Sequence, residues 1–319
     1  MLANTIYVAG ATGYIGREVV LQALNLGYVV HASARRQGQE SLPDHRNLIV
    51  DIIDAQKGQI QFNIPKGASV ISCLASRTGT AQDAERIDHR LNLALLSAAK
   101  SKGAAMFIML SAICVQKPRL TFQHAKLKFE AALQASDMTF IIVRPTAYFK
   151  SLTGQIHRLR KKKSFLVFGT GKETACMPIS KRDLALFMIG TISRPNTWNS
   201  VLPIGGPKPA FTPVETAQMI SKIFATPAKT RSVSPRIFDI LHGVLAPIRP
   251  FSHWAREKSE LMKIGKYYAT ESMLVWDATQ CRYDTDATPS TGNDTFYDHL
   301  LKIRDIGSIE MVDKQTRLF

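Results

Sequence analysis

The sequence predicts an α/β protein: a doubly wound parallel sheet with a smaller, mostly helical C-terminal lobe. Three observations predict it: glycines spaced in threes after the first apolar run, alternating strand and helix patterns through the first half, and a less regular second half. The 319 residues suffice for one large domain or for a core domain with a smaller lobe.

The glycines follow the first strand pattern. An apolar run ends at Gly10-x-x-Gly13-x-x-Gly16, and a helical pattern begins at once. The first glycine allows a tight turn, the second lets the backbone approach a pyrophosphate, and the third lets the helix lie close on the strand. The helix N-terminus then faces the phosphates. The pattern, in the spacing common among short-chain dehydrogenases, predicts a dinucleotide (Rossmann) site contacted by Gly10, Thr12, Gly13, Tyr14, Ile15 and Gly16.

The residues after the second strand, expected at 28–34, indicate which dinucleotide binds. Arg35 and Arg36 stand where NAD enzymes usually place a carboxylate for the ribose 2′-hydroxyl. Guanidinium groups attract a 2′-phosphate through charge-assisted hydrogen bonds. Two solvated arginines would be the plain alternative, but their position relative to the glycines favours NADP(H). Asp51, at the end of the third strand (47–50), is expected near the adenine.

Later elements continue the alternation. Strands are expected at 68–74, 105–111 and 139–143, and helices at 82–102 and 118–135. Further cofactor contacts are expected from Cys73, Leu74, Ala75, Ser111, Lys126 and Pro145. Residues 1–150, joined again by 176–206, are expected to form the dinucleotide-binding domain, and residues 151–175 and 207–319 the substrate-binding lobe. Within that lobe the apolar segment 237–248 reads as a core helix, or as the wall of a pocket for a large apolar ligand; the core helix is slightly favoured.

The composition limits the kinds of partner that the chain is expected to bind. The net charge of +16 could attract nucleic acid, anionic lipid or small anions. No nucleic-acid motif is present, so no nucleic-acid partner is expected. The densest basic run, 158–163, reads as a solvated helix end, and a peripheral contact with an anionic membrane stays open. Four widely spaced cysteines without a C-x-x-C pair indicate no metal site. No apolar stretch approaches the roughly 20 residues that span a bilayer, and the early first strand leaves no room for a targeting segment.

The usual catalytic position carries the wrong residue for carbonyl reduction. Short-chain dehydrogenases acting on alcohols place Tyr-x-x-x-Lys on the helix after the fifth strand, whereas this chain has Phe122-Gln-His-Ala-Lys126. Phenylalanine cannot donate a proton, although Lys126 can still bind the ribose. Three readings remain: reduction of a carbon–carbon double bond, NADPH binding without catalysis, or replacement of the tyrosine by another acid. The candidates for such an acid are Ser111, Cys114, His124 and Tyr148.

Several longer stretches of the sequence resemble those of a known enzyme family. Val143-Arg-Pro-Thr-Ala-Tyr-Phe-Lys-Ser-Leu152 and Lys263-Ile-Gly-Lys-Tyr-Tyr-Ala-Thr-Glu-Ser-Met-Leu274, with 72–77, 110–118, 125–130 and 202–207, resemble the NADPH-dependent divinyl chlorophyllide 8-vinyl reductases. These are atypical short-chain dehydrogenases of (bacterio)chlorophyll synthesis. The resemblance implies reduction of the 8-vinyl group of divinyl (proto)chlorophyllide to ethyl, a reaction with no carbonyl oxygen to protonate. Without the transit segment of some members, a bacterial-type cytoplasmic protein is expected, with attachment to the photosynthetic membrane left open.

The resemblance also implies residue roles. Lys126 would fix the ribose, Phe122 would stand at the catalytic tyrosine position, and Ser111 would lie beside the nicotinamide. Hydride would reach the terminal vinyl carbon while the macrocycle spreads the negative charge, and solvent water could give the proton. The flat, apolar, magnesium-bearing pigment with its propionate needs an apolar pocket edged by cations. The residues expected to bind it are Cys114, Tyr148, Phe149, Lys150, Trp254 and Lys263.

Two alternatives remain beside the vinyl reductase. The first is a non-catalytic NADP(H)-binding redox sensor or assembly factor of the same structural group, whose members also lack the tyrosine. The second is a reductase of another conjugated double bond, similar to the isoflavone-reductase-like enzymes. Such an enzyme should accept small phenolic substrates and need no tetrapyrrole-sized pocket.

Overall fold

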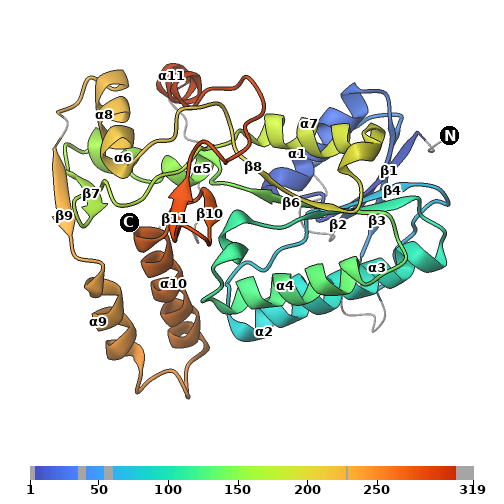
Figure 1. Cartoon of the computed structure of the whole chain (residues 1–319), viewed down its shortest axis with the longest axis horizontal. Coiled ribbons are helices and arrows are strands. Elements are labelled where there is room, and N and C mark those ends of the chain that lie inside the picture. Colours follow the sequence, from blue (N-terminus) through green and yellow to red (C-terminus); the bar gives the residue numbers. More distant parts are fainter. Residues whose placement is uncertain (1–3, 35–40, 54–59, 228, 307–319) are drawn as a thin grey trace. The chain divides into compact units, whose positions relative to one another are not determined.

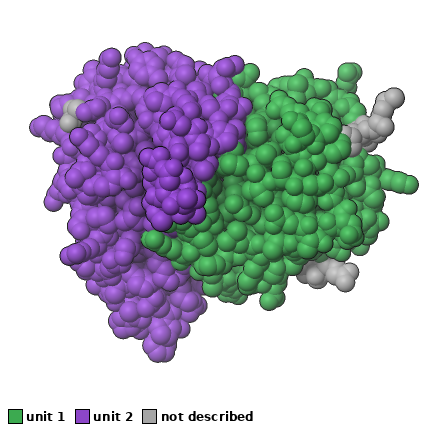
Figure 2. Space-filling model, in the orientation of Figure 1, with its two compact units in different colours: residues 1–77, 81–145, 181–203 green, residues 78–80, 146–180, 204–319 purple. Residues whose placement is uncertain are grey.

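The structure is a computed structural model that describes residues 4–34, 41–53, 60–227 and 229–306 (Figure 1). The chain divides into two compact units, coloured separately in Figure 2. Unit 1 comprises Met1–Arg77, Ala81–Pro145 and Lys181–Pro203, and unit 2 comprises Thr78–Thr80, Thr146–Ser180 and Ile204–Phe319.

Unit 1 contains a seven-stranded sheet in the order β3-β2-β1-β4-β5-β6-β8. The strands are β1 (Thr5–Ala9), β2 (Val29–Ala34), β3 (Leu48–Ile52), β4 (Ser69–Ser72), β5 (Met106–Leu110), β6 (Phe140–Pro145) and β8 (Ser200–Ile204). All pairs from β3 through to β6 are parallel. Because β1 lies between β2 and β4, the strand order reverses at the carboxyl end of β1, where doubly wound sheets bind their ligands. The predicted fold class is confirmed.

Helices cover both faces of this sheet. Figure 1 shows α1 (Tyr14–Asn25) and α7 (Lys181–Gly190) on one face, and α2 (Ala81–Ala84), α3 (Asn92–Ser101) and α4 (Thr121–Gln134) on the other. A π-helical stretch, η2 (Glu85–Leu91), joins α2 to α3, and short 3-10 turns complete the unit as η3 (Ile113–Gln116), η4 (Thr191–Ser193) and η5 (Pro195–Thr197). One core cluster includes the fully buried Tyr7, Leu95, Phe107 and Phe129.

Unit 2 is mostly helical. Its helices are α5 (Phe149–Leu152), α6 (Ile156–Arg160), α8 (Pro213–Ile223), α9 (Arg236–Leu245), α10 (His253–Thr270) and α11 (Phe296–Ile306). Two small sheets accompany them, a parallel pair of β7 (Phe165–Phe168) with β9 (Thr230–Val233) and an antiparallel pair of β10 (Val275–Asp277) with β11 (Arg282–Asp284). The core of this unit packs Phe149, Ile156, Ile220, Phe296 and Leu300.

The apolar segment 237–248 forms most of α9 and the turn that follows it. Of the residues of α9, only Phe238 is buried, while Ile240, Leu241 and Val244 are exposed. The favoured interpretation of this segment as a core helix is therefore wrong, although the helix itself is present. The polar residues Arg236, Asp239 and His242 recur at three-residue spacing on one side of the helix, and the apolar residues lie on the other. Such a pattern usually indicates that the apolar side is covered, whereas here most of that side is exposed.

The packing of α9 on α10 depends on a glycine. A Cβ atom added to Gly265 would lie 2.5 Å from Cε1 of Phe238, which is buried. We expect Gly265→Ala to lower the free energy of unfolding of unit 2 by about 1–3 kcal/mol, because the aromatic ring must move. Urea denaturation measures this change. Gly243→Ala is the matched control, because its Cβ meets nothing within 4 Å; an equal loss in both variants would contradict the close contact.

Candidate active site

The glycine turn has the geometry that its spacing predicts. Gly10 has a φ of +76°, and a Cβ there would lie 2.8 Å from the carbonyl oxygen of Cys73. A Cβ on Gly16 would lie 2.1 Å from the carbonyl oxygen of Gly10, so the start of α1 lies directly on the turn. Gly13 is exposed and occupies the N-cap of α1, where no side chain caps the helix. The open helix N-terminus and the bare backbone of the turn fit a dinucleotide pyrophosphate.

The segment that follows β4 lies beside this turn. The amide of Cys73 donates to the carbonyl oxygen of Ala9 over 2.9 Å, which continues the pairing of β4 with β1. Burial raises the pKa of the Cys73 thiol to about 12, and the positive charge of Lys126 acts in the opposite direction. Cys73 and Lys126 are therefore close enough to interact, so the structure brings a residue from the end of β4 together with one from α4. Leu74 and Ala75 continue the segment, half-buried and exposed respectively.

Lys126 is held by a buried carboxylate that the sequence did not reveal. Its Nζ lies 3.0 Å from Oδ1 of Asp88, and both side chains are almost fully buried. The other oxygen of Asp88 accepts a hydrogen bond of 3.3 Å from the amide of Ser76, in the segment after β4. Asp88 thus fixes the Lys126 ammonium at the end of the sheet that carries the glycine turn. One signal was present: Asp88 falls on the helix face of Ala84, Leu91 and Leu95, where a carboxylate must find a partner.

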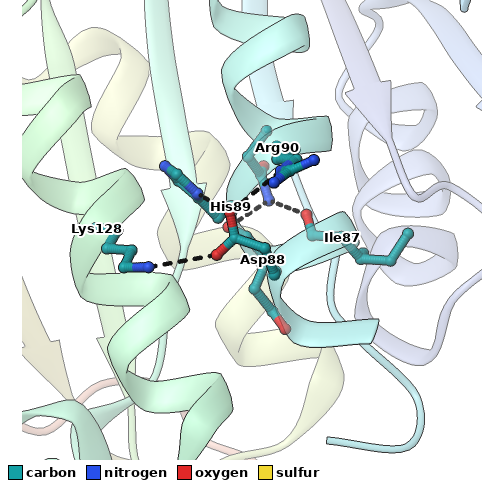
Figure 3. Close-up of polar contacts among 7 residues, drawn as sticks. Ile87, Asp88, His89, Arg90 and Lys128 are labelled. Atoms are coloured by element: carbon teal, nitrogen blue, oxygen red, sulfur yellow. Dashed lines mark hydrogen bonds and ion pairs between the residues drawn. The ribbon is translucent and has the colours of Figure 1, made fainter. Parts of the chain in front are cut away.

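The π-helical stretch that carries Asp88 is anchored to the sheet by Asn92. The side-chain amide of Asn92 donates to the carbonyl oxygens of Ile87 (3.0 Å) and Asp88 (3.2 Å), and its oxygen accepts from the hydroxyl of Ser72 (2.6 Å). On the outer side, Glu85 accepts from His89, Arg90 and Lys128 (Figure 3). The hydrogen bond from His89 is the largest cause lowering the pKa of Glu85 to about 2. The ionised Glu85 therefore contributes its full stabilisation at pH values above 4.5, the ordinary pKa of a glutamate. That stabilisation is lost as the pH falls through about 2.

A second buried network lies at the ends of β5 and β6. The hydroxyl of Ser111 donates to Oε1 of Glu130, and Glu130 also accepts from two nitrogens of Arg144. Ser111 and Glu130 are both buried. Because its proton is committed to a carboxylate, the Ser111 oxygen is oriented as an acceptor toward any other partner. Glu130 was not singled out in the sequence, although it lies one helical turn after Lys126.

Phe122 and Lys126 share one side of α4. Phe122 is half-buried in the first turn of the helix, and Lys126 follows one turn later. Between them, the buried Gln123 accepts from the amides of Arg119 (2.7 Å) and Leu120 (2.8 Å) and so caps the helix. The helix therefore begins at Thr121 rather than at the expected Pro118. No ionisable group stands at position 122.

The other residues expected at the cofactor are placed as follows. Asp51 lies inside β3, which runs on to Ile52, and its Oδ1 accepts a hydrogen bond of 3.1 Å from Asn63. Its Oδ2 is buried without a partner among the described residues. Ile15 and Pro145 are buried, and Thr12 and Tyr14 are half-buried. Arg35 and Arg36 lie outside the described residues, so their role at a 2′-phosphate stays a prediction.

The residues expected to bind the pigment fall in both units. Cys114 is buried in η3 of unit 1. In unit 2, Tyr148 and Lys150 flank Phe149 in the sequence. The ring of Phe149 packs in the core, with its centroid 5.5 Å from the ring centroid of Phe296. Trp254 lies on an exposed surface of α10, and Lys263 pairs with Glu260 over 2.7 Å. Their part in substrate binding remains a prediction.

Within the described ranges, no group of three His, Cys, Asp or Glu side chains is arranged to hold a metal ion. Across the same residues, no helix combines the length and the apolar character needed to cross a bilayer.

Residues 10–195 match a family model described as NAD(P)H-binding. The fold resembles UDP-glucuronic acid 4-epimerase from Bacillus cereus, solved in complex with UDP-glucuronic acid and NAD, with a TM-score of 0.65 and 16% identity over 93% of this chain and 96% of that one. The fold and the glycine turn thus define a dinucleotide-binding protein of the short-chain dehydrogenase type.

Sequence relatives narrow this class. The chain is 41% identical over 320 residues to the chloroplastic divinyl chlorophyllide a 8-vinyl-reductase of Arabidopsis thaliana, covering 93% of this chain and 76% of the relative. A photosystem II assembly factor of Guillardia theta is 26% identical over 283 residues, or 82% of each chain. This chain belongs to the family of divinyl chlorophyllide a 8-vinyl-reductases, and the predicted resemblance is confirmed.

Proposed function

We propose that this protein uses NADPH to reduce the 8-vinyl group of divinyl chlorophyllide, or of its protochlorophyllide form, to an ethyl group. The observation that carries the proposal is the pair of Lys126, held by the buried Asp88, and Phe122, one turn earlier on α4. A group that binds the nicotinamide ribose is kept, while the proton donor of carbonyl reduction is missing. Membership of the reductase family supports the same reaction.

The side chains at this end of the sheet have separate roles in the proposed reaction. The glycine turn and the N-terminus of α1 bind the pyrophosphate, and Lys126 hydrogen-bonds the ribose. When bound, NADPH supplies the hydride that reduces the vinyl group. Asp88 holds the Lys126 ammonium in place, and Phe122 offers an apolar edge where a tyrosine would offer a proton. The main contribution of the protein is thus to orient the reactants and exclude water.

We also propose roles for further residues at the cofactor and at the substrate. Arg35 and Arg36 would bind the 2′-phosphate, and Asp51 would lie near the adenine. Unit 1 would hold the cofactor. The tetrapyrrole would be bound by Cys114, Tyr148, Phe149, Lys150 and Lys263. We also propose a cytoplasmic-type protein that contacts its membrane peripherally.

The experiment is an anaerobic incubation of the purified protein with divinyl chlorophyllide and either NADPH or NADH, followed by chromatographic separation of divinyl and monovinyl pigment. We expect monovinyl product with NADPH and much less with NADH, because a 2′-phosphate would bind the arginines. Tight NADPH binding by folded protein without product from either pigment form would overturn the reductase. It would favour a non-catalytic binding protein, a class to which the weaker similarity to the photosystem II assembly factor points.

Asp88→Asn tests how Lys126 is held. Loss of the carboxylate leaves a buried ammonium without its counter-charge, so we expect the free energy of unfolding to fall by about 3 kcal/mol. We also expect NADPH affinity to fall about tenfold, because Lys126 is no longer fixed. Equilibrium unfolding and a binding titration measure the two effects. Glu85→Gln, on the exposed side of the same π-helical stretch, should keep wild-type NADPH affinity; equal weakening in both variants would contradict a specific role for Asp88.

A further inference from the structure

An exposed apolar surface lies on the hairpin formed by α9 and α10 of unit 2. The helices pack against each other through Phe238 and Gly265, and the turn 246–252 joins them. Figure 1 shows the turn at the end of the hairpin that lies away from β7 and β9 of the same unit. The exposed apolar side chains are Ile240, Leu241, Val244, Ile248, Phe251 and Trp254.

Packing within the described part of the chain leaves these side chains uncovered. Ile240, Val244 and Ile248 follow one another at four-residue spacing and so share one side of α9 and its extension. Phe251 in the turn is 91% exposed, and Trp254 in the first turn of α10 is 58% exposed. A helix on the surface of a soluble protein usually turns polar residues outward. Large apolar side chains exposed together on one helical hairpin are typical of an interaction surface.

Basic side chains surround the patch. Arg249 donates to His242 (3.0 Å) and Ser259 (3.4 Å), and Arg256 donates to the carbonyl oxygens of Arg249 and Pro250 (3.2 Å each). These contacts hold the turn, and neither guanidinium group pairs with a carboxylate among the residues that the structure describes. Lys258, one helical turn after Trp254 on α10, likewise forms no ion pair with those residues.

The acidic residues of the hairpin do not offset these charges. Asp239 pairs with Lys266 over 2.7 Å, and Glu260 pairs with Lys263 over 2.7 Å. Glu257 lies 3.7 Å from the ring of His253. Asp239 and Glu260 therefore face lysines. Arg249, Arg256 and Lys258 outnumber the remaining carboxylate, Glu257, so the end of the hairpin keeps a positive charge next to its apolar side chains.

We propose that the end of the α9–α10 hairpin docks on an anionic lipid surface. The apolar stripe of α9, with Phe251 and Trp254, enters the boundary between headgroups and acyl chains, and the arginines and lysine meet the anionic headgroups. Tryptophan at this depth matches its preference for the membrane interface. The inference deepens the peripheral membrane contact of the proposed function by naming the surface that makes it, and it holds whichever substrate the protein uses.

Two other occupants fit the surface less well. A second copy of the chain, joined through the same patch, would bring the positive charges of both hairpins together. A single pigment molecule on the outer side of a helix would keep much of its surface in water, whereas ligand sites usually enclose their ligands. The lipid surface alone satisfies both the apolar stripe and its basic border.

The experiment is vesicle flotation of the full chain, using vesicles of phosphatidylcholine alone or with roughly one third phosphatidylglycerol. We expect the protein to float with the mixed vesicles and hardly with the neutral ones, and to be released by high salt. Val244→Ser and Phe251→Ser should each lower the bound fraction, giving roughly a tenfold weaker partition coefficient. Both side chains are exposed, so the variants should fold, which circular dichroism verifies.

Ile306→Ser is the matched control, because Ile306 is 72% exposed at the end of α11 in the same unit. It should float as the wild type does. Unchanged flotation of both hairpin variants, or an equal loss in the control, would overturn the proposal. So would flotation that depends on the basic run 158–163 and not on the hairpin. Self-association in solution that Phe251→Ser abolishes, without vesicle binding by the wild type, would assign the surface to a second copy instead.

Discussion

Lys126→Met is expected to reduce vinyl-reductase turnover by at least about a hundredfold and to weaken NADPH binding, because the substitution removes the group that fixes the nicotinamide ribose. Its ammonium is buried against Asp88 and its charge acts on Cys73, so a neutral side chain cannot take its place. Steady-state rates with divinyl chlorophyllide and a separate NADPH titration measure the two effects.

The substitution also leaves the Asp88 carboxylate buried without its partner, which costs about 3–5 kcal/mol of stability. The double variant Lys126→Met with Asp88→Asn removes that charge, and we expect it to recover stability but not NADPH affinity. Lys128→Met is the matched control: it lies two residues further on α4, is exposed, and contacts only Glu85 among the residues that the structure describes. Full activity in the double variant would show that Lys126 does not bind the cofactor.

Gly16→Ala has the second large expected effect. A Cβ at this position would lie 2.1 Å from the carbonyl oxygen of Gly10, which belongs to the backbone and cannot rotate away. Either α1 moves off the turn or the turn opens, so we expect a loss of about 3 kcal/mol in the free energy of unfolding. The same shift displaces the N-terminus of α1 from the phosphates, so NADPH affinity should fall more than tenfold.

Thermal unfolding with and without NADPH measures both consequences of Gly16→Ala, since a bound ligand stabilises the folded state by an amount that grows with the logarithm of its concentration divided by its dissociation constant. Gly154→Ala serves as the control, because a Cβ at Gly154 meets nothing within 4 Å. If Gly16→Ala kept the wild-type shift on adding NADPH, the glycine turn would not be where the pyrophosphate binds.

The sequence predicted the sheet because its signals are local. An apolar run, a glycine turn and an amphipathic helix each follow from neighbouring residues, so the strands from β1 to β6 fall close to their expected ranges. The glycines at 10, 13 and 16 also predict the turn, because few other backbone conformations require this spacing.

The parts of the site that the sequence missed depend on contacts across the fold. Asp88 and Lys126 lie on two different helices, and the spacing along each helix shows a buried face but not which side chains of the two faces meet. The role of Glu130 depends on its hydrogen bonds with Ser111, which follows β5, and with Arg144 of β6. The exposure of α9 was missed for a related reason: an apolar helix predicts burial, but only the arrangement of its neighbours shows which side stays uncovered.

The most direct test of the proposed reaction follows the hydrogen atoms. Purified protein is incubated with divinyl chlorophyllide and NADPH that carries deuterium at nicotinamide C4, in separate reactions for each face of the ring, and the product is examined by mass spectrometry and NMR. We expect one deuterium in the methyl group of the new 8-ethyl side chain, from one of the two labelled forms, with the second hydrogen coming from solvent. Monovinyl product without deuterium from either form would contradict direct reduction of the vinyl group at this site.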